Sequence, residues 1–361
     1  MPDILRDELV RLTCDMIRFQ STADRPDQLS AVVDYLDHYL SAIPGIFVHR
    51  STSNGKPAIV ATLHDTYEPA LLLNGHVDVV MGQPAQFDPQ IRDGRIYGRG
   101  SQDMKGSVAV LLRLLKDLAA RDMRPDVGFQ FVSDEEIGGA HGTERLFNDG
   151  WRCDYFIAAE PTDMNICNEH KGALWIELRL PGMSAHGSRP WEGRNPILAL
   201  HAGLAGLFEH FPPLEQATWR TTVTPTAIQA GIGSPNQVPP ELDLTLDVRH
   251  IPDDQPEDIL ALVRTCFPAA EEIACRRAAP LATSPENPHV RRLAAVTTRI
   301  RNQEPQFYSE HFSTDARFYS AAGIPAVCFG PVGAGLHSPE EWVAIDSLVQ
   351  MYDVLHTMIL E

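Results

Sequence analysis

The chain has 361 residues, of which 43% are hydrophobic and 22% are charged, and this composition is typical of a folded globular protein rather than a disordered or collagen-like one. Thirty Lys and Arg against 48 Asp and Glu give a formal charge of −18, which repels nucleic-acid phosphates and anionic lipids and suits cationic partners such as metal ions. At roughly 150 residues per domain, the length predicts two domains. We expect neither nucleic acid nor a membrane among the partners.

The N-terminal segment predicts a helix and no export signal. Met1 to Gln20 places apolar residues at helical spacing among acidic ones, whereas a secretory signal has a basic start and an apolar core. No apolar run approaches the ~20 residues that a membrane span requires. The six cysteines are scattered without a CxxC pair, so neither a zinc knuckle nor a disulfide framework is indicated. We therefore expect a cytoplasmic protein.

Alternating strand and helix patterns predict a first domain of the α/β class. Between Pro57 and Ala159, short apolar runs typical of buried strands alternate with helical patterns. Such alternation is typical of a mainly parallel sheet flanked by helices, in which functional groups gather at the carboxyl ends of the strands. The predicted elements are the strands Ala58–Leu63, Ala70–Leu73, Val127–Val132 and Tyr155–Ala159, the helix Met104–Ala120 and a small hairpin turning at Asp93-Gly94.

The pattern changes after about Glu169, and this change predicts an inserted second domain. The order there is β-α-β-β-α-β, as in a ferredoxin-like α+β domain. The predicted elements are the strands Leu174–Leu180, Thr222–Ala230, Leu242–Arg249 and Ile273–Arg277 and the helices Asn195–Phe211 and Gln255–Phe267. A linker at Pro280–Pro288, a helix at His289–Arg301 and a buried strand at Ile324–Phe329 follow. We place the first, discontinuous domain at residues 1–170 and 284–361 and the inserted domain at residues 171–283.

Metal-binding and proton-handling residues follow the predicted strands at several points. The segments are Gly75–Asp78, Gly98–Gly106, Ser133–Gly139, Ala158–Thr162 and Leu336–Pro339. Taken singly, each is typical of an ordinary polar turn or loop. Together they bring two histidines and three to four carboxylates to the strand ends of one sheet. This is the mixed nitrogen and oxygen ligand set of a two-metal hydrolytic site.

Several of these residues suit particular tasks in such a site. His76 and Asp78 lie on the same side of a strand, where the carboxylate can orient a metal-binding imidazole. Asp103, between two strand ends, can bridge two cations because each of its oxygens can bind one ion. Adjacent Glu135 and Glu136 can divide two tasks, one as a ligand and the other as the acceptor of a proton from water. The glycine-rich segment before Asp103 lacks the third glycine of a dinucleotide-binding loop, which disfavours a nucleotide cofactor.

The ordered segments resemble the M20 family of zinc-dependent amidohydrolases, with acetylornithine deacetylase, succinyl-diaminopimelate desuccinylase and aminoacylase and carboxypeptidase relatives. The resemblance covers nearly the whole chain and rests on Gly75–Asp78, Tyr97–Gly106, Ser133–Gly138, Ala159–Thr162, Gly182–Pro196, Asn236–Pro239, Thr314–Phe318 and Gly330–Pro339. It implies that His76, Asp103 and Glu160 hold one zinc ion and that Asp103, Glu136 and His337 hold the other. Co²⁺ or Mn²⁺ is an expected substitute, and the peptide bond after Asp103 is often cis in such enzymes.

The resemblance also implies the catalytic and substrate-binding residues. It makes Glu135 the general base and Asp78 the residue that orients a histidine ligand. The inserted domain is then a lid and dimerisation domain, in which His186 resembles the oxyanion-stabilising histidine supplied by the partner subunit. Asn236 and Arg249 resemble the residues that hold the substrate backbone and carboxylate, and Arg249 suits a carboxylate because its guanidinium fork binds in bidentate fashion. A homodimer formed through the lid is expected.

The resulting hypothesis is a metal-dependent hydrolase that removes the acyl group from an N-acyl-L-amino acid by attack of a zinc-bridging hydroxide. The expected substrate is similar to acetylornithine or succinyl-diaminopimelate, and His170-Lys171-Gly172 looks slightly more like the acetylornithine or acetyl-lysine deacetylases. A metallo-carboxypeptidase or dipeptidase of the same family is an alternative, because the same zinc chemistry serves it. A non-catalytic metal-binding protein on this scaffold is another, although Glu135 and Asp78 are both present.

Overall fold

The protein divides into two compact units. The computed structural model describes residues 2–231 and 234–361. The first unit consists of Met1–Glu169, Ala282–Tyr308 and Thr314–Glu361, and the second consists of His170–Leu281 and Ser309–Ser313. The first unit is therefore discontinuous in sequence. The short segment Ser309–Ser313 groups with the second unit, which no feature of the sequence indicated.

The first unit is built from sheets and the helices that cover them. Its helices are α1 (Pro2–Ile17), α2 (Pro26–Ser41), α3 (Gly106–Ala119), α4 (Thr143–Asn148), α7 (Pro288–Arg301), α8 (Ala316–Ser320) and α9 (Ile345–Leu360). Its strands, some of which run across the unit boundary, are β1 (Phe47–Ser53), β2 (Lys56–Thr62), β3 (Leu71–His76), β4 (Gln90–Arg92), β5 (Arg95–Tyr97), β6 (Val127–Val132), β7 (Tyr155–Ala158), β8 (Ile166–His170), β13 (Leu281–Ala282), β14 (Phe307–Glu310), β15 (Ala326–Cys328), β16 (Gly333–Ala334) and β17 (Trp342–Ala344).

The main sheet has parallel strands at its centre. Its order is β1-β2-β6-β3-β7-β15-β8-β13, in which β6, β3, β7 and β15 are parallel while β1, β2 and β8 pair in antiparallel fashion. Leu71 of β3 lies opposite both Val127 of β6 and Tyr155 of β7, so these three strands begin level with one another. Their carboxyl ends therefore lie at the same edge of the sheet. The predicted mainly parallel sheet is confirmed for this central part.

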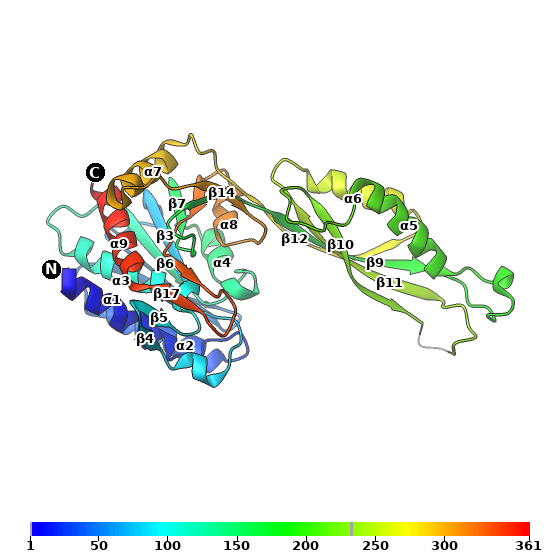
Figure 1. Cartoon of the computed structure of the whole chain (residues 1–361), viewed down its shortest axis with the longest axis horizontal. Coiled ribbons are helices and arrows are strands. Elements are labelled where there is room, and N and C mark those ends of the chain that lie inside the picture. Colours follow the sequence, from blue (N-terminus) through cyan, green and yellow to red (C-terminus); the bar gives the residue numbers. More distant parts are fainter. Residues whose placement is uncertain (1, 232–233) are drawn as a thin grey trace. The chain divides into compact units, whose positions relative to one another are not determined.

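Apolar sequence on both faces explains why the centre of the sheet is buried. Every residue of β6 is buried, and α3 is buried along most of its length because it is apolar on nearly all sides. Figure 1 shows α1, α3 and α9 together on one face of the sheet and α4 and α8 on the other. Leu111 of α3 and Phe129 of β6 belong to the same hydrophobic core. Helices thus cover both faces of the sheet whose strand ends carry the candidate site residues.

A small antiparallel sheet also belongs to the first unit, in the order β16-β17-β5-β4. Its hairpin turns at Asp93 and Gly94, as predicted, and both residues have the positive φ (50° and 70°) that a tight hairpin turn of this kind requires. Strand β17 then pairs with β5, with Val343 opposite Ile96. This pairing joins two segments that are far apart in the chain.

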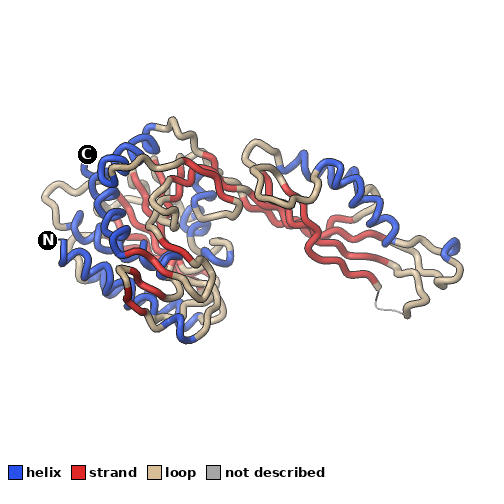
Figure 2. The backbone as a smooth tube through the Cα atoms, viewed as in Figure 1, coloured by secondary structure: helices blue, strands red, loops and turns tan. Residues whose placement is uncertain are grey.

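The second unit has the predicted β-α-β-β-α-β order. Its elements are β9 (Gly172–Pro181), α5 (Pro196–His210), β10 (Thr222–Ala230), β11 (Glu241–His250), α6 (Pro256–Cys266) and β12 (Glu271–Ala278), and the sheet order is β10-β11-β9-β12. Alternate residues of β9 and β11 are buried, because one face of the sheet packs under α5 and α6. Figure 2 shows these two helices on the same side of the strands. The other face carries charged and aromatic side chains such as Trp175 and Arg249.

Several predicted boundaries differ from the structure by a few residues. The helix predicted from Met104 begins at Gly106, because residues 101–105 form a separate buried turn in which Asp103 has non-helical angles (φ −117°, ψ 93°). The predicted linker Pro280–Pro288 includes β13, and the strand predicted at Ile324–Phe329 is the shorter β15. Met1, the first residue of the predicted opening helix, lies outside the described residues. No helix within residues 2–231 and 234–361 has both the length and the apolarity to cross a bilayer.

Candidate active site

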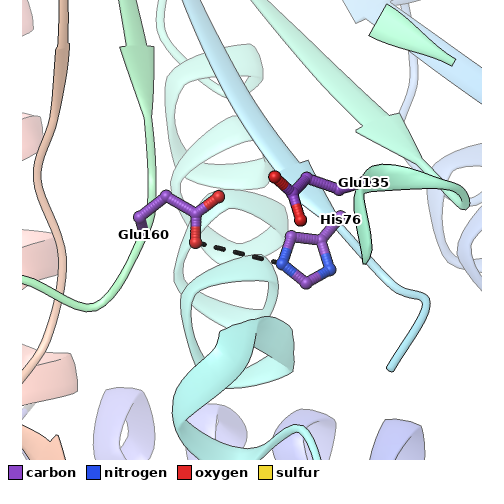
Figure 3. Close-up of side chains that lie close together, drawn as sticks. All are labelled: His76, Glu135 and Glu160. Carbon is purple, nitrogen blue, oxygen red and sulfur yellow. Dashed lines mark ion pairs between the residues drawn. The ribbon is translucent and has the colours of Figure 1, made fainter. Parts of the chain in front are cut away.

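Three neighbouring parallel strands each deliver a predicted site residue. His76 is the last residue of β3, Glu135 begins the turn after β6, and Glu160 lies shortly after β7. Because β6, β3 and β7 are adjacent and end at the same edge, these side chains meet. Figure 3 shows the carboxylates of Glu135 and Glu160 beside the imidazole of His76. Glu160 Oε2 lies 3.9 Å from His76 Nε2.

Asp103 and His337 reach the same place through the small sheet. Asp103 lies in the turn after β5, His337 lies in the loop between β16 and β17, and β17 pairs with β5. His337 has a left-handed backbone (φ 58°), which is uncommon for a residue other than glycine. Its Nε2 lies 3.3 Å from Asp103 Oδ2 and 3.3 Å from Glu136 Oε2. The pairing of distant segments therefore completes the cluster at the strand ends.

Asp103 lies between the two histidines. Its Oδ1 is 2.9 Å from His76 Nε2, and its Oδ2 is 3.3 Å from His337 Nε2. A carboxylate that turns one oxygen toward each of two imidazoles is placed to bridge two cations. The peptide bond between Asp103 and Met104 is cis.

Within the part of the chain that the structure describes, the side chains able to hold a metal ion form two groups, each with its ligand atoms within 4.8 Å of one another. The groups are His76, Glu135 and Glu160, and Asp103, Glu136 and His337. The second group has the composition that the family resemblance implies for one zinc site. The first contains the predicted base, Glu135, beside two predicted ligands. Glu135, the predicted base, therefore lies directly beside side chains that could hold an ion.

The cluster gathers four buried or half-buried carboxylates, whose negative charges would repel one another. Burial, and then the charge of Glu160, raises the pKa of Glu135 well above its usual value. Burial likewise raises the pKa of Glu160, whose Oε1 has no hydrogen-bond partner. Hydrogen bonds to Asp103 and Glu136 raise the pKa of His337 to about 10, so the carboxylates favour positive charge among them. Nitrogen and oxygen donors with this charge fit zinc or a similar divalent ion.

The sequence matches the model of peptidase family M20/M25/M40 over residues 72–361. The chain belongs to this family. It is a hydrolase that acts on amide bonds.

Proteins similar to this M20 hydrolase include a desuccinylase by sequence and two peptidases by fold. The succinyl-diaminopimelate desuccinylase of Xanthomonas campestris pv. campestris (strain B100) is 28% identical over 393 residues, covering 98% of this chain and 99% of the relative. The aminopeptidase PepT from Bacillus cereus has a TM-score of 0.80 at 16% identity over 98% of each chain. The metallo-carboxypeptidase Sso-CP2 from Sulfolobus solfataricus has a TM-score of 0.76 at 18% identity over 98% of each chain. These two solved structures share the fold with the M20 chain.

Asp78 contacts both candidate metal-binding groups of the M20 hydrolase. His76 Nδ1 lies 3.0 Å from the Asp78 backbone carbonyl and 3.5 Å from its Oδ1. The other carboxylate oxygen, Oδ2, accepts a hydrogen bond of 3.0 Å from the backbone N–H of Glu136. The predicted orientation of His76 thus involves the main chain of Asp78 as well as its carboxylate. The contact with Glu136 was not foreseen, because it depends on the turn after β6.

A buried network beneath the turn that carries both glutamates was missed by sequence reasoning. Asp315 Oδ2 accepts from Thr143 Oγ1 at 2.5 Å, and Arg317 Nη2 donates to the Gly138 carbonyl at 2.7 Å. Burial and the charge of Asp315 raise the pKa of Asp134 to about 7. These contacts hold the turn from several sides. The available signal was the segment Thr314–Phe318, which carries the family resemblance but had no assigned role.

The remaining predicted site residues belong to the second unit. His186 Nδ1 lies 2.8 Å from Ser188 Oγ, and its Nε2 lies 3.5 Å from Asn236 Nδ2, so the structure brings His186 and Asn236 together. Asn236 precedes β11, whereas Arg249 lies near the C-terminal end of this strand. The Nε and Nη2 atoms of Arg249 donate to the two carboxylate oxygens of Asp247 at 2.7 and 3.1 Å. Arg249 therefore already has a bidentate partner, which a substrate carboxylate would have to share or displace.

Proposed function

We propose that this M20 hydrolase is a two-zinc deacylase that removes the acyl group from an N-acyl-L-amino acid. The observation that carries the proposal is the position of Asp103, whose two oxygens face His76 and His337. Asp103 would then be shared by both ions, with His76 and Glu160 as the other ligands of one and Glu136 and His337 as those of the second. The desuccinylase name of the curated relative supports a deacylase.

When bound, the zinc ions supply Lewis acidity, which polarises an amide carbonyl and makes water more acidic at neutral pH. Glu135 accepts a proton from the attacking water and delivers it to the amide nitrogen, so that the C–N bond breaks to give a carboxylic acid and an amine. His186 donates a hydrogen bond to the carbonyl oxygen as negative charge develops there. Water attacks the carbonyl directly, so no covalent enzyme intermediate forms.

Positive charge in the second unit supports a substrate that carries carboxylates. Lys171 is only 2% exposed, and its Nζ donates to the Arg220 carbonyl at 2.6 Å. Burial, and then the charges of Arg220 and Arg249, lowers the pKa of Lys171. The ring centroid of Trp219 lies 5.7 Å from Lys171 Nζ, and the ring centroid of Trp175 lies 5.2 Å from Arg249 Cζ. In a chain with a net charge of −18, such a local concentration of cations favours an anionic ligand.

A substrate panel tests the proposed function. The protein is loaded with two equivalents of Zn²⁺ and assayed for amine release from N-acetylornithine, N-succinyl-LL-diaminopimelate and a set of dipeptides. We expect kcat/KM to be highest for one of the two acyl amino acids. Absence of hydrolysis of every compound, with two ions bound, would contradict the proposal.

A peptidase is the second candidate. Solved structures with this fold include an aminopeptidase and a metallo-carboxypeptidase, and the zinc chemistry is the same. Hydrolysis of dipeptides with a higher kcat/KM than both acyl amino acids would establish this alternative. A non-catalytic metal-binding protein is disfavoured, because such a protein has no need to keep Glu135 and Asp78 beside the metal-binding residues.

Arg249 provides a test of substrate-carboxylate binding. We expect Arg249→Met to raise KM by about 10-fold or more and to change kcat less, because one hydrogen-bonded charge contact contributes about 1.5–3 kcal/mol. The matched control is Arg179→Met, since Arg179 lies on the same face of the sheet and makes a similar fork to Asp243 at 2.8 and 3.0 Å. Steady-state kinetics measure both variants. An equal KM for the two variants would remove Arg249 from the substrate site.

The proposed enzyme is a homodimer formed through the second unit. Helix α5 exposes Ile197 (46%) and Leu198 (69%), and the outer strand β10 exposes Ile228 (53%). Exposed apolar groups beside the outer strand of a sheet favour association with another chain.

The cytoplasmic location expected from the sequence stays a prediction.

A charge on α5 is expected to break the dimer. Leu198→Asp places a carboxylate on the apolar helix face and should shift the protein from dimer to monomer in light scattering. The control is Met123→Asp in the first unit, where Met123 is 86% exposed. If His186 acts across the dimer, mixing the inactive variants His186→Ala and Glu135→Gln restores activity, because one site of the mixed dimer has both residues. A fully active Leu198→Asp monomer would rule out that role for His186.

A further inference from the structure

Arg99 and Glu341 form a buried ion pair beside the metal-binding cluster. Arg99 Nη1 lies 2.5 Å from Glu341 Oε2, and the two side chains are 3% and 1% exposed. Taking both charges out of water is costly, so such a pair is weak evidence for stability alone. No role was assigned to either residue from the sequence. The other hydrogen bonds of Arg99 and Glu341 indicate a role for the pair.

The second oxygen of Glu341 holds the backbone that carries Asp103. Glu341 Oε1 accepts hydrogen bonds from the backbone N–H groups of Gln102 and Asp103, at 3.1 and 3.2 Å. With one oxygen on Arg99 and the other on two N–H groups, the carboxylate is held at both ends. Hydrogen bonds to a charged acceptor are about twice as strong as neutral ones. The position of Asp103 is therefore set by Glu341 as well as by its own turn.

The pair also connects this turn to the loop that carries His337. Glu341 lies at the end of that loop, directly before β17, and its backbone carbonyl accepts from the N–H of Gly98 at 3.1 Å. Arg99 Nη2 lies 3.5 Å from the carbonyl of Met81, in the segment after β3. The Arg99–Glu341 pair thus joins three segments: the turn that carries Asp103, the loop that carries His337 and the segment that follows His76.

We propose that Glu341, held by Arg99, is a positioning residue for the group Asp103, Glu136 and His337, and that it sets the affinity of this group for its metal ion. The inference rests on the proposed function, because it concerns the same centre. Partners that hold metal ligands in place typically change metal affinity by about 10–100-fold when they are replaced. We therefore expect loss of this contact to weaken binding of one ion more than of the other.

The test uses Glu341→Gln. Glutamine has one oxygen and one NH₂ group, so it can satisfy either Arg99 or the two backbone N–H groups but not both. The metal-free protein is titrated with Zn²⁺ against a chromophoric chelator, and the number of bound ions and both affinities are measured. We expect one ion to bind about 10–100-fold more weakly and the other to change less. With Co²⁺, the variant should show the spectrum of one tightly held ion per chain at a concentration that fills both sites of the unaltered protein.

The control is Glu8→Gln. Glu8 pairs with Arg113 between α1 and α3 at 2.5 Å, with side chains 14% and 17% exposed. This variant should lower the melting temperature without changing either metal affinity. Unchanged affinities in Glu341→Gln would overturn the proposal.

If Glu341→Gln does not fold, Arg99→Lys replaces it. Lysine keeps the positive charge but loses the fork that reaches both Glu341 and Met81, so the same ion should bind more weakly. Unchanged metal affinities in this variant would also overturn the proposal.

Measurements on the unaltered protein distinguish failure of this inference from failure of the proposed function. If the unaltered protein holds two ions and hydrolyses acyl amino acids while the variants bind metal normally, only the positioning role fails. If it holds fewer than two ions, both proposals fail.

Discussion

Replacing Glu135 with glutamine is expected to lower kcat by about 10²–10⁴-fold while both metal ions stay bound, because a general acid–base group contributes a factor of this size. Glutamine keeps the shape of the side chain but cannot accept a proton at neutral pH. Glu135 lies in one group with His76 and Glu160, so its carboxylate is placed to exchange a proton with water at the centre. KM should change little, since Glu135 is not among the residues proposed to bind the substrate.

Steady-state kinetics and metal analysis of the same preparation measure this effect. The control is Glu340→Gln, close to His337 in the chain but with a side chain 81% exposed, and its activity should be unchanged. Near-normal turnover of Glu135→Gln would remove the general-base role. Loss of one ion together with activity would instead make Glu135 a ligand, which its place in the first group permits.

Replacing Asp103 with asparagine is expected to weaken the binding of both ions and to reduce hydrolysis to background. The carboxylate has one oxygen toward His76 and the other toward His337, so its charge serves both groups. Removing one partner of a buried charge interaction costs about 3–5 kcal/mol, which corresponds to about 10²–10⁴-fold in affinity. An ordinary hydrolase residue that binds only the substrate would not affect metal content.

Thermal unfolding with and without Zn²⁺ gives a readout that does not depend on activity. A ligand that binds only the folded state raises the melting temperature, so Zn²⁺ should stabilise the unaltered protein and should stabilise Asp103→Asn much less. Asp346→Asn serves as the control, because the Asp346 side chain is 77% exposed and pairs with Arg6 of α1. If Asp103→Asn keeps two ions and the full Zn²⁺-dependent shift, the bridging role is wrong.

Local sequence patterns were sufficient for much of the fold and for part of the site. The predicted strands Val127–Val132 and Thr222–Ala230 have the same bounds as β6 and β10. Short apolar runs ended by turn residues identify such strands without knowledge of their partners. The meeting of His76, Glu135 and Glu160 was predictable as well, because parallel strands deliver the residues that follow them to one edge.

The contacts made by polar residues in loops were not predictable in this way. Arg99 and Glu341 look like ordinary surface residues in the sequence, yet both are buried and joined to each other. Arg249 was predicted to hold the carboxylate of the substrate, and the sequence did not indicate that its guanidinium also contacts Asp247. Such pairings depend on which side chains share a buried volume, and local periodicity carries no information about that.

By itself, the sequence determined the α/β first domain, the β-α-β-β-α-β second domain and the nitrogen and oxygen donors available for metal, because periodicity and residue chemistry are local properties. The family resemblance already implied that Asp103 serves the ions of both His76 and His337, but only the tertiary structure decided which oxygen of Asp103 faces each histidine and that Glu341 holds the backbone of Asp103. Those positions depend on the pairing of β17 with β5. The register of two distant strands is set by side-chain fit and burial in the folded chain, which no single segment contains.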